Sequence, residues 1–375
     1  MKVALVHDWL TGMRGGERCL EHLCRLFPEA DIYTLFHFEG TISPLIEKHD
    51  ITTSFLQRFP FVRKHYRSYL PFYPLAIESL RLRGEYDLII STSHCVAKGI
   101  IPDPETVHIS YCFTPMRYIW DRRFDYFGRA GRVKSAIIRP VLHYLRMWDV
   151  TSSQRVSHFV AISKYVRRRI GMYYHRPADV VYPPVDCSLF HVSDSVDDYY
   201  LMVSAFAPYK RLDYAIRAFN GLGRRLIVVG KGPEEKRLKM LGGKNIEFMG
   251  WLPDRELRSV YARCRALIFP GVEDFGMIPV EVQASGRPVI ALARGGVLES
   301  VVPYRDRENP GTGLFFNEPT SEAIIEAVRR FEDVEQDYSQ EAIRANALRF
   351  DTTVFMKEFK EVVQRIYGER KIKND

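Results

Sequence analysis

The chain opens twice with the same local pattern, a short apolar strand followed by a loop and a helix. The first opening spans residues 2–27 and the second spans residues 199–219. Short, uniformly apolar strands that alternate with helical segments are typical of parallel sheets covered by helices on both faces. Two such openings therefore predict an α/β protein with two doubly wound, Rossmann-like domains, each binding its ligand at the carboxyl ends of its strands.

Further apolar runs continue each series. They lie at 87–90, 108–111 and 158–161 in the first half, and at 226–229, 246–248, 266–269 and 288–291 in the second. A chain of 375 residues is long enough for two ordinary domains. We expect a first domain at 1–183, a linker at 184–198, a second domain at 199–351, and a C-terminal helix with a charged tail at 352–375.

The composition favours a soluble, reduced, cytoplasmic protein. Apolar residues make up 46% of the chain, and no stretch approaches the roughly 20 apolar residues that span a bilayer. The N-terminus is typical of a strand and not of a signal peptide, because Asp8 follows it directly. The six cysteines form no CxxC pair, so we expect buried thiols and neither a disulfide framework nor a metal site.

All of the excess positive charge lies in the first half of the chain. Residues 1–190 hold 26 Lys and Arg against 18 Asp and Glu, whereas residues 191–375 hold 28 of each. A basic half fits a phosphate-bearing ligand, an anionic membrane or nucleic acid, or it is simply a solvated face. No RNA- or DNA-binding motif accompanies the charge, so nucleic acid is not an expected partner.

Aromatic and basic side chains alternate between residues 55 and 86, and Arg167-Arg168-Arg169 adds a second basic cluster. This composition suits the interface of an anionic membrane or an acceptor that carries a lipid diphosphate. The alternative is an aromatic core with a solvated basic rim, and three prolines interrupt any long amphipathic helix there. We expect a protein that associates peripherally with the inner face of the cell membrane.

Two glutamates flank the loop that follows one of the later strands. Glu273 comes shortly after the run 266–269, and Glu281 lies eight positions on, beyond Pro279, which suits the first turn of a helix. This predicts Glu273 beyond the end of a strand and Glu281 in the first turn of a helix. Carboxylates accept hydrogen bonds from vicinal hydroxyls, and N–H groups at a helix start favour anions. The segment therefore predicts a site for a sugar linked to a phosphate. The backbone groups expected to face that ligand belong to Phe275, Gly276 and Met277.

Several segments together resemble the retaining glycosyltransferases of family 4. The matching segments are Gly15-Gly16-Glu17, 208–213, 229–233, Glu273 with Glu281, 286–290, Gly295-Gly296 and 312–314. They stretch over nearly the whole chain, and the blocks 91–99 and 111–121 look like those of bacterial and archaeal enzymes that build surface polysaccharides, often mannosyltransferases. The resemblance implies the GT-B fold, in which two Rossmann-like domains face a cleft, with the nucleotide-sugar bound by the second and the C-terminal helix packed back on the first.

The resemblance also implies roles for individual residues. Glu273 would contact the transferred sugar, Lys210 would neutralise the diphosphate, and His94 would contact sugar or acceptor unless it is structural. The candidate donor-binding residues are Gly15, Gly16, Lys210, Arg211, Gly232, Phe275, Gly276, Met277 and Glu281. The candidate acceptor contacts are Lys98, Arg117 and Asp121, the last two of which could instead pair with each other. The chain departs from the pattern at Phe113, where many relatives have His, and at Ala205, where many have Arg.

The expected reaction is transfer of a sugar, with mannose from GDP-mannose as the best candidate, to a lipid-linked saccharide in polysaccharide biosynthesis. The resemblance implies retention of configuration, and a site built on Lys210 and backbone dipoles would need no metal or other cofactor. A UDP-sugar donor and a catalytically silent sugar-nucleotide-binding or assembly protein are the alternatives. A dinucleotide-dependent oxidoreductase would need a G-x-G-x-x-G turn, which neither opening contains.

Overall fold

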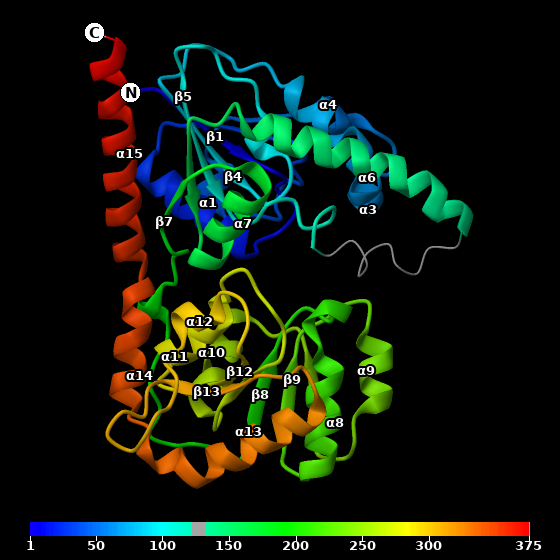
Figure 1. The fold of residues 1–375 in the computed structure, drawn as a ribbon, viewed down its shortest axis with the longest axis vertical. Helices are drawn as coiled ribbons and strands as arrows, with labels where there is room; N and C mark the ends of the chain where they lie inside the picture. Colours follow the sequence, from blue (N-terminus) through cyan, green and yellow to red (C-terminus); the bar gives the residue numbers. More distant parts are fainter. Residues whose placement is uncertain (122–131, 375) are drawn as a thin grey trace. The chain divides into compact units, whose positions relative to one another are not determined.

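The computed structural model describes residues 1–121 and 132–374 and divides into two compact units (Figure 1). The first unit comprises Met1–Pro184 and Thr353–Asp375, and the second comprises Val185–Thr352. Each unit contains one sheet whose strands are all parallel. The prediction of two doubly wound α/β domains is therefore confirmed.

The sheet of the first unit has the strand order β3-β2-β1-β4-β5-β6-β7. Its strands are β1 (Val3–His7), β2 (Asp31–Thr34), β3 (Ile51–Thr53), β4 (Leu88–Ser93), β5 (Val107–Cys112), β6 (His158–Ala161) and β7 (Ala178–Val180). Its α-helices are α1 (Gly15–Leu26), α2 (Pro44–Glu47), α3 (Val62–His65), α4 (Tyr73–Glu78), α6 (Arg132–Ser153), α7 (Lys164–Tyr174) and α15 (Thr352–Asn374), with 3₁₀ turns η1 (Phe55–Arg58), η2 (Tyr66–Phe72) and η3 (Ala97–Gly99).

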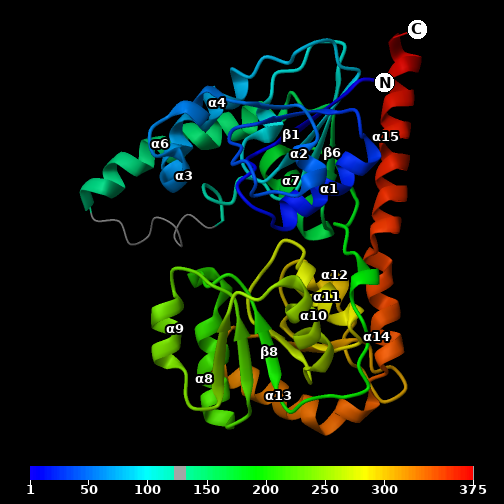
Figure 2. The ribbon, with the colours of Figure 1, turned by 180° about the vertical axis from the view of Figure 1, so that it is seen from behind.

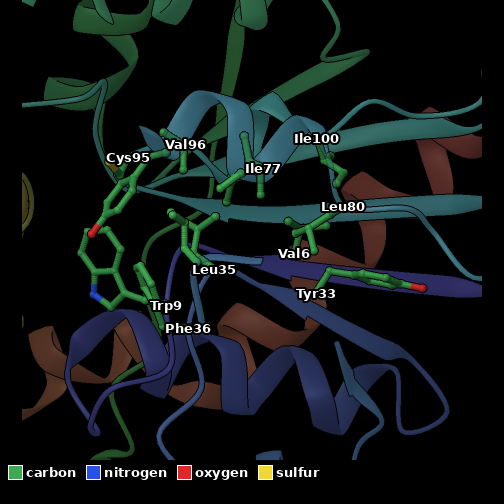
Figure 3. Close-up of a cluster of buried hydrophobic side chains, with 14 of the residues drawn as sticks. Val6, Trp9, Tyr33, Leu35, Phe36, Ile77, Leu80, Cys95, Val96 and Ile100 are labelled. Carbon is green, nitrogen blue, oxygen red and sulfur yellow. The ribbon is translucent and has the colours of Figure 1, made fainter. Parts of the chain in front are cut away.

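A large apolar cluster covers one face of this sheet. Figure 3 shows Val6 of β1 lying near Ile77 of α4 and near Leu80, which follows that helix. The same cluster includes Trp9, which lies edge-on to Tyr66 with ring centroids 5.8 Å apart. Several aromatics between residues 55 and 86 are therefore part of a core, as the alternative interpretation of that segment expected.

The last helix packs on the first unit. Phe355 and Phe359 of α15 place their rings 5.8 Å and 5.4 Å from that of Tyr111 in β5. Phe355 also lies 6.4 Å from His22 of α1, and Figure 2 shows α15 beside α1. These aromatic contacts bury the apolar side of α15 against the first sheet and its first helix.

The sheet of the second unit has the strand order β10-β9-β8-β11-β12-β13. Its strands are β8 (Tyr200–Val203), β9 (Leu226–Val229), β10 (Ile246–Gly250), β11 (Leu267–Phe269), β12 (Val289–Leu292) and β13 (Gly313–Phe316). Its α-helices are α8 (Leu212–Leu222), α9 (Glu235–Leu241), α10 (Asp254–Arg263), α11 (Met277–Ala284), α12 (Val297–Ser300), α13 (Ser321–Val334) and α14 (Gln340–Ala347), with 3₁₀ turns η4 (Cys187–Leu189), η5 (Pro208–Lys210), η6 (Glu335–Asp337) and η7 (Leu348–Phe350). Ser321 Oγ donates to the Tyr214 carbonyl at 3.0 Å, which ties α13 to α8 beside it (Figure 1).

The stretch expected as a linker, 184–198, joins the second unit from Val185 onward. Arg344 Nη1 donates to the Phe190 carbonyl at 3.0 Å, and the Asp197 N–H donates to the Arg263 carbonyl at 2.8 Å. Hydrogen bonds of this kind hold the stretch against α14 and the end of α10.

The first unit should lose stability in mild acid through His108. This residue of β5 is fully buried, and its Nε2 lies 2.8 Å from Ser91 Oγ. Burial lowers its pKa to about 3, although a backbone hydrogen bond with Arg155 opposes the shift and the charges of Arg155 and Lys98 add to it. Between that pKa and the ordinary value of about 6.5, the unfolded chain binds a proton that the folded chain does not. Stability therefore falls as the pH falls, by about 1.4 kcal/mol per unit from this group.

We expect acidification from pH 7 to pH 5 to lower the urea midpoint less in His108→Gln than in the wild type. Trp9, Trp120 and Trp148 provide a fluorescence signal from this unit. The exposed His65→Gln is the matched control and should behave as the wild type does. An identical pH dependence in His108→Gln and the wild type would contradict the prediction.

Candidate functional site

In each sheet the order of the strands reverses between two neighbouring strands near its centre. The order places β1 beside β4 in the first unit and β8 beside β11 in the second, with earlier strands on one side and later strands on the other. Ligands of doubly wound sheets bind at such a switch point, outside the carboxyl ends of the strands. The segments after β1, β4, β8 and β11 are therefore where functional side chains are expected.

Lys210 and Glu273 meet at this edge of the second sheet. Lys210 ends η5, which follows β8, and Glu273 lies in the loop after β11. Lys210 Nζ forms an ion pair with Glu273 Oε1, and the two side chains keep 12% and 19% of their surface exposed. The tertiary structure thus brings together two residues predicted separately, one as a diphosphate contact and one as a sugar contact.

The loop after Glu273 turns through Gly276, which has a left-handed φ of 93° and caps α11 without a side-chain hydrogen bond. Phe275 is buried, with its ring 5.4 Å from that of Phe350, whereas Gly276 and Met277 are half-buried. Because the packed Phe275 fixes the loop, the backbone at the start of α11 is held in place, as a binding site requires.

Gly295 and Gly296 hold this loop from the other side. The Gly296 N–H donates to the Glu273 carbonyl at 2.9 Å. A Cβ atom on Gly296 would lie 2.4 Å from the Asp274 carbonyl oxygen, so only glycine allows the two backbones to approach this closely. The resemblance named this glycine pair without a role, and the structure places it directly behind Glu273.

Glu281 lies one turn deeper than predicted. Since α11 begins at Met277, Pro279 is in the first turn and Glu281 opens the second. Glu281 is buried, and its Oε2 accepts a hydrogen bond from Tyr261 of α10 at 2.9 Å. Sequence reasoning missed Tyr261, because nothing in its local pattern links it to a glutamate twenty residues later.

Arg211 and Gly232 occupy less direct positions. Arg211 is exposed and adopts a left-handed φ of 56° as it begins α8, next to Lys210. A Cβ on Gly232 would lie 2.5 Å from the Phe206 carbonyl oxygen, so this glycine lets the segment after β9 pack on the segment after β8. Ala205, which stands where relatives have Arg, is exposed. The donor-binding roles of Arg211 and Gly232 remain predictions.

In the first unit, the sequence pattern predicts Gly15 and Gly16 in the loop before a helix that begins at Glu17, but the structure places both in the first turn of α1. A Cβ on Gly16 would lie 3.2 Å from Cε2 of Phe113. Phe113 is buried against Tyr111, with ring centroids 5.4 Å apart. The ring that replaces the family histidine therefore packs beneath the glycine pair.

A set of buried polar residues surrounds the end of β1, and sequence reasoning named only Glu17 among them as part of a matching segment, the one with Gly15 and Gly16. His7 Nδ1 lies 2.6 Å from Thr92 Oγ1, and His7 Nε2 lies 3.9 Å from Glu17 Oε1. Asp8 is fully buried and hydrogen-bonds to the segment after β4, which includes His94. Burial alone would raise the pKa of Glu17, but the interaction with His7 lowers it below its ordinary value. The signal available in the sequence was an acidic residue directly after a buried strand.

The three candidate acceptor contacts do not form one group. Lys98 is 1% exposed, and its Nζ lies 2.5 Å from Asp149 Oδ1, so the ammonium is held inside the first unit and is not open to an acceptor in this structure. Asp121 pairs with Arg169 of α7 and accepts a hydrogen bond from the hydroxyl of Tyr173, while Arg117 is half-buried. Arg169 is itself buried, so the cluster 167–169 presents only Arg167 and Arg168 to solvent.

The segment 55–86 is divided between core and surface. Its exposed side chains include Phe55, Arg58, Phe61, Arg63, Lys64, Arg67, Phe72 and Leu75. Phe61 is 76% exposed and has a left-handed φ of 56°, which is unusual for a bulky side chain. None of the helices in the described ranges is both long and apolar enough to cross a bilayer. Within the same ranges, no group of three or more His, Cys, Asp or Glu side chains could hold a metal ion.

Residues 190–349 match the family model described as glycosyl transferases group 1. The matched range lies within the second unit and includes Lys210, Glu273 and Glu281. The second unit is therefore a glycosyl transferases group 1 domain.

Curated relatives are similar to parts of the chain at low identity. An uncharacterised glycosyltransferase of Methanocaldococcus jannaschii is 29% identical over 164 residues, covering 42% of this chain and 46% of the relative. An O-antigen chain mannosyltransferase of Salmonella typhimurium is 26% identical over 159 residues, covering 39% and 45%. The chain thus matches about half the length of these relatives.

Among solved structures, HepE of Anabaena in complex with UDP-glucose has a similar fold, with a TM-score of 0.71 at 17% identity. The match covers 97% of this chain and all of that one. At this identity the likeness shows the fold, which is that of GT-B glycosyltransferases.

Proposed function

We propose that the protein is a retaining glycosyltransferase of family 4 that moves a sugar from a nucleotide donor to a saccharide acceptor. The observation that carries the proposal is the Lys210–Glu273 ion pair at the switch point of the glycosyl transferases group 1 domain. A cation and a carboxylate at one sheet edge match the two halves of a sugar nucleotide, since the diphosphate needs positive charge and the sugar needs hydrogen-bond acceptors.

The proposed reaction uses few protein groups. The bond between the sugar carbon and the diphosphate oxygen breaks, and its electron pair leaves with the diphosphate, whose charge Lys210 stabilises. The acceptor oxygen bonds to the same face of that carbon, and its proton passes to the leaving phosphate. Glu273 orients the sugar, Glu281 binds the ribose hydroxyls, and the charge of Lys210 lets the site work without a metal.

Mannose from GDP-mannose is the donor that we propose first, because O-antigen chain mannosyltransferases are among the matched relatives. The proposed acceptor is a lipid-linked saccharide in polysaccharide biosynthesis. A UDP-sugar is the second candidate donor, since the fold is shared with HepE, whose structure contains UDP-glucose.

Thermal unfolding with GDP, UDP, ADP or dTDP, without added metal, tests the donor proposal. A ligand that binds only the folded state adds about 2.7 kcal/mol of stability at one hundred times its Kd. We expect GDP to raise Tm most, and the shift to shrink in Glu281→Ala. Selectivity for UDP or dTDP would overturn the mannose donor, and no shift with any nucleotide would contradict the nucleotide site. Binding without transfer or hydrolysis of any sugar nucleotide would favour the silent binding protein.

We further propose that the exposed side chains of segment 55–86 bind an anionic membrane, where a lipid-linked acceptor would lie. Phe61 combines high exposure with a backbone conformation that costs energy, and such strain persists mainly where function requires it. Arg63 and Lys64 are exposed beside it. An aromatic ring flanked by cations fits the interface of a bilayer with anionic headgroups.

Binding to phosphatidylcholine vesicles with and without phosphatidylglycerol tests this surface. Removing both charges in Arg63→Ala/Lys64→Ala should weaken binding to anionic vesicles about 30-fold, since each basic residue near the surface contributes about 1 kcal/mol. Phe61→Ser should also weaken binding. Trp251→Ser, which removes an aromatic of 67% exposure in the second unit, is the control that should not. Equal binding by Phe61→Ser and Trp251→Ser would contradict the proposal.

A further inference from the structure

Asp8 is the most firmly held carboxylate at the switch point of the first unit. It directly follows β1 and is fully buried. Its Oδ2 accepts hydrogen bonds from the backbone N–H groups of His94 and Cys95 at 2.7 Å and 3.0 Å, and its Oδ1 accepts from those of Val96 and Ala97 at 2.6 Å and 2.7 Å. Four converging donors leave this carboxylate no freedom to rotate.

The same carboxylate also contacts the imidazole of His94. His94 Nδ1 lies 2.9 Å from Asp8 Oδ2. The Trp9 ring lies against the imidazole at 4.5 Å between centroids, with the ring planes 84° apart. Together these two contacts fix both the position and the plane of the imidazole.

This geometry assigns the hydrogen on the imidazole. An ionised carboxylate can only accept hydrogen bonds, so Nδ1 must carry a hydrogen to bond to Asp8. In the neutral ring Nε2 is then a hydrogen-bond acceptor. No residue in the described part of the chain hydrogen-bonds to Nε2, and the side chain of His94 remains 24% exposed whereas that of Asp8 is fully buried.

The ionised state of Asp8 is consistent with this assignment. Burial alone would raise its pKa, but His94 holds the pKa well below the ordinary value through its charge when the ring is protonated and through its hydrogen bonds, with a smaller contribution from His7. Asp8 thus remains an acceptor at any pH at which the protein would be assayed.

We propose that Asp8 is a positioning residue that holds His94 with Nδ1 protonated and Nε2 directed at a hydroxyl group of the carbohydrate substrate. The identity of the substrate rests on the proposed function, whereas the state of the imidazole does not. The location supports the proposal, because β1 and β4 lead into Asp8 and His94 at the one edge of this sheet where its topology favours a ligand.

The competing interpretation is that Asp8 only closes the backbone turn 94–97 and that His94 is a packing residue. Two substitutions of His94 distinguish these interpretations. Asn places its amide near the position of Nδ1, so it can keep the bond to Asp8 but cannot reach the substrate. Gln places its amide oxygen near the position of Nε2, so it can still accept a hydrogen bond from a hydroxyl.

Activity measured with the sugar donor that the protein turns over should fall roughly 10- to 100-fold in His94→Asn, the loss expected when a hydrogen bond in the site is removed. His94→Gln should retain more activity than His94→Asn. His158→Gln is the matched control, because His158 Nε2 also bonds an aspartate, Asp179 Oδ2 at 2.8 Å, but at the amino end of β6. Full activity in His94→Asn would overturn the contact with substrate.

Nitrogen-15 NMR of the histidine side chains tests the positioning directly and needs no turnover. In the wild type the signal that disappears in His94→Gln should show a protonated Nδ1 and an unprotonated Nε2 in the neutral ring. In folded Asp8→Asn this preference should be lost. The opposite tautomer in the wild type would overturn the proposal even if Asp8→Asn does not fold. Absence of transfer with every donor would instead defeat the proposed function and leave the NMR result valid.

Discussion

Lys210→Ala is expected to lower kcat/KM for the sugar donor by about 10²- to 10³-fold, the loss seen when one preorganised electrostatic contact to a transition state is removed. Lys210 Nζ pairs with Glu273 at the carboxyl edge of the second sheet, and 12% of the side chain remains exposed. Its removal takes away the charge that faces a leaving diphosphate. It also leaves the Glu273 carboxylate without its partner, and the unneutralised carboxylate would repel that diphosphate.

The double variant Lys210→Ala/Glu273→Gln separates these two effects. If repulsion by Glu273 contributes, the double variant should bind nucleotide more tightly than Lys210→Ala alone, although it should remain slow in transfer. Lys239→Ala is the matched control: this lysine also pairs with a glutamate, Glu235 at 2.8 Å, but on the exposed surface of α9. Donor kinetics and nucleotide-induced thermal shifts provide the readouts. Wild-type kinetics in Lys210→Ala would contradict the site.

Gly296→Ala is expected to lower transfer by about 10²-fold, the cost of displacing reacting groups by about 1 Å. The added methyl group would lie 2.4 Å from both the Asp274 carbonyl oxygen and the Phe275 Cα atom. Both neighbours are backbone atoms, so the loop that carries Glu273 must move. The hydrogen bond from the Gly296 N–H to the Glu273 carbonyl, 2.9 Å long, would be lost or lengthened as well.

Gly221→Ala is the control for the added methyl group. A Cβ at Gly221 would meet only Ile325 Cδ1, at 3.8 Å, and the residue lies inside α8, where alanine is the better helix former. We expect this variant to be as active as the wild type and no less stable. Circular dichroism and the second unit's thermal transition check that Gly296→Ala is folded. Normal transfer by a folded Gly296→Ala would show that the loop tolerates displacement.

The positions of the second-unit site follow largely from local pattern. A buried strand that ends at Phe269 and a helix that contains Pro279 are visible in the sequence, and they place Glu273 in the loop between them. Lys210 likewise follows a recognisable strand. The fold class was predictable for the same reason, since the spacing of apolar runs decides which segments become strands and which become helices.

Burial and pairing at the first-unit site were not predictable. Lys98 was a candidate acceptor contact because it follows a strand, yet Asp149, which lies 51 residues later, holds it inside the unit. Asp8 served only to argue against a signal peptide and was given no role in the site, although it accepts hydrogen bonds from the backbone of four residues that are 86 to 89 positions away. Neither contact can be recognised from the spacing of apolar and polar residues within a short segment of the sequence.

The sequence by itself determined the two parallel α/β sheets and the short segments that carry Lys210, Glu273 and Glu281. Each of these depends on the spacing of apolar residues, glycines and prolines within a short segment. Only the tertiary structure decided that Lys210 pairs with Glu273, that Glu281 meets Tyr261 and that Asp8 holds His94. These contacts join residues far apart in the chain, and their geometry is set when neighbouring strands pair and the helices pack on them.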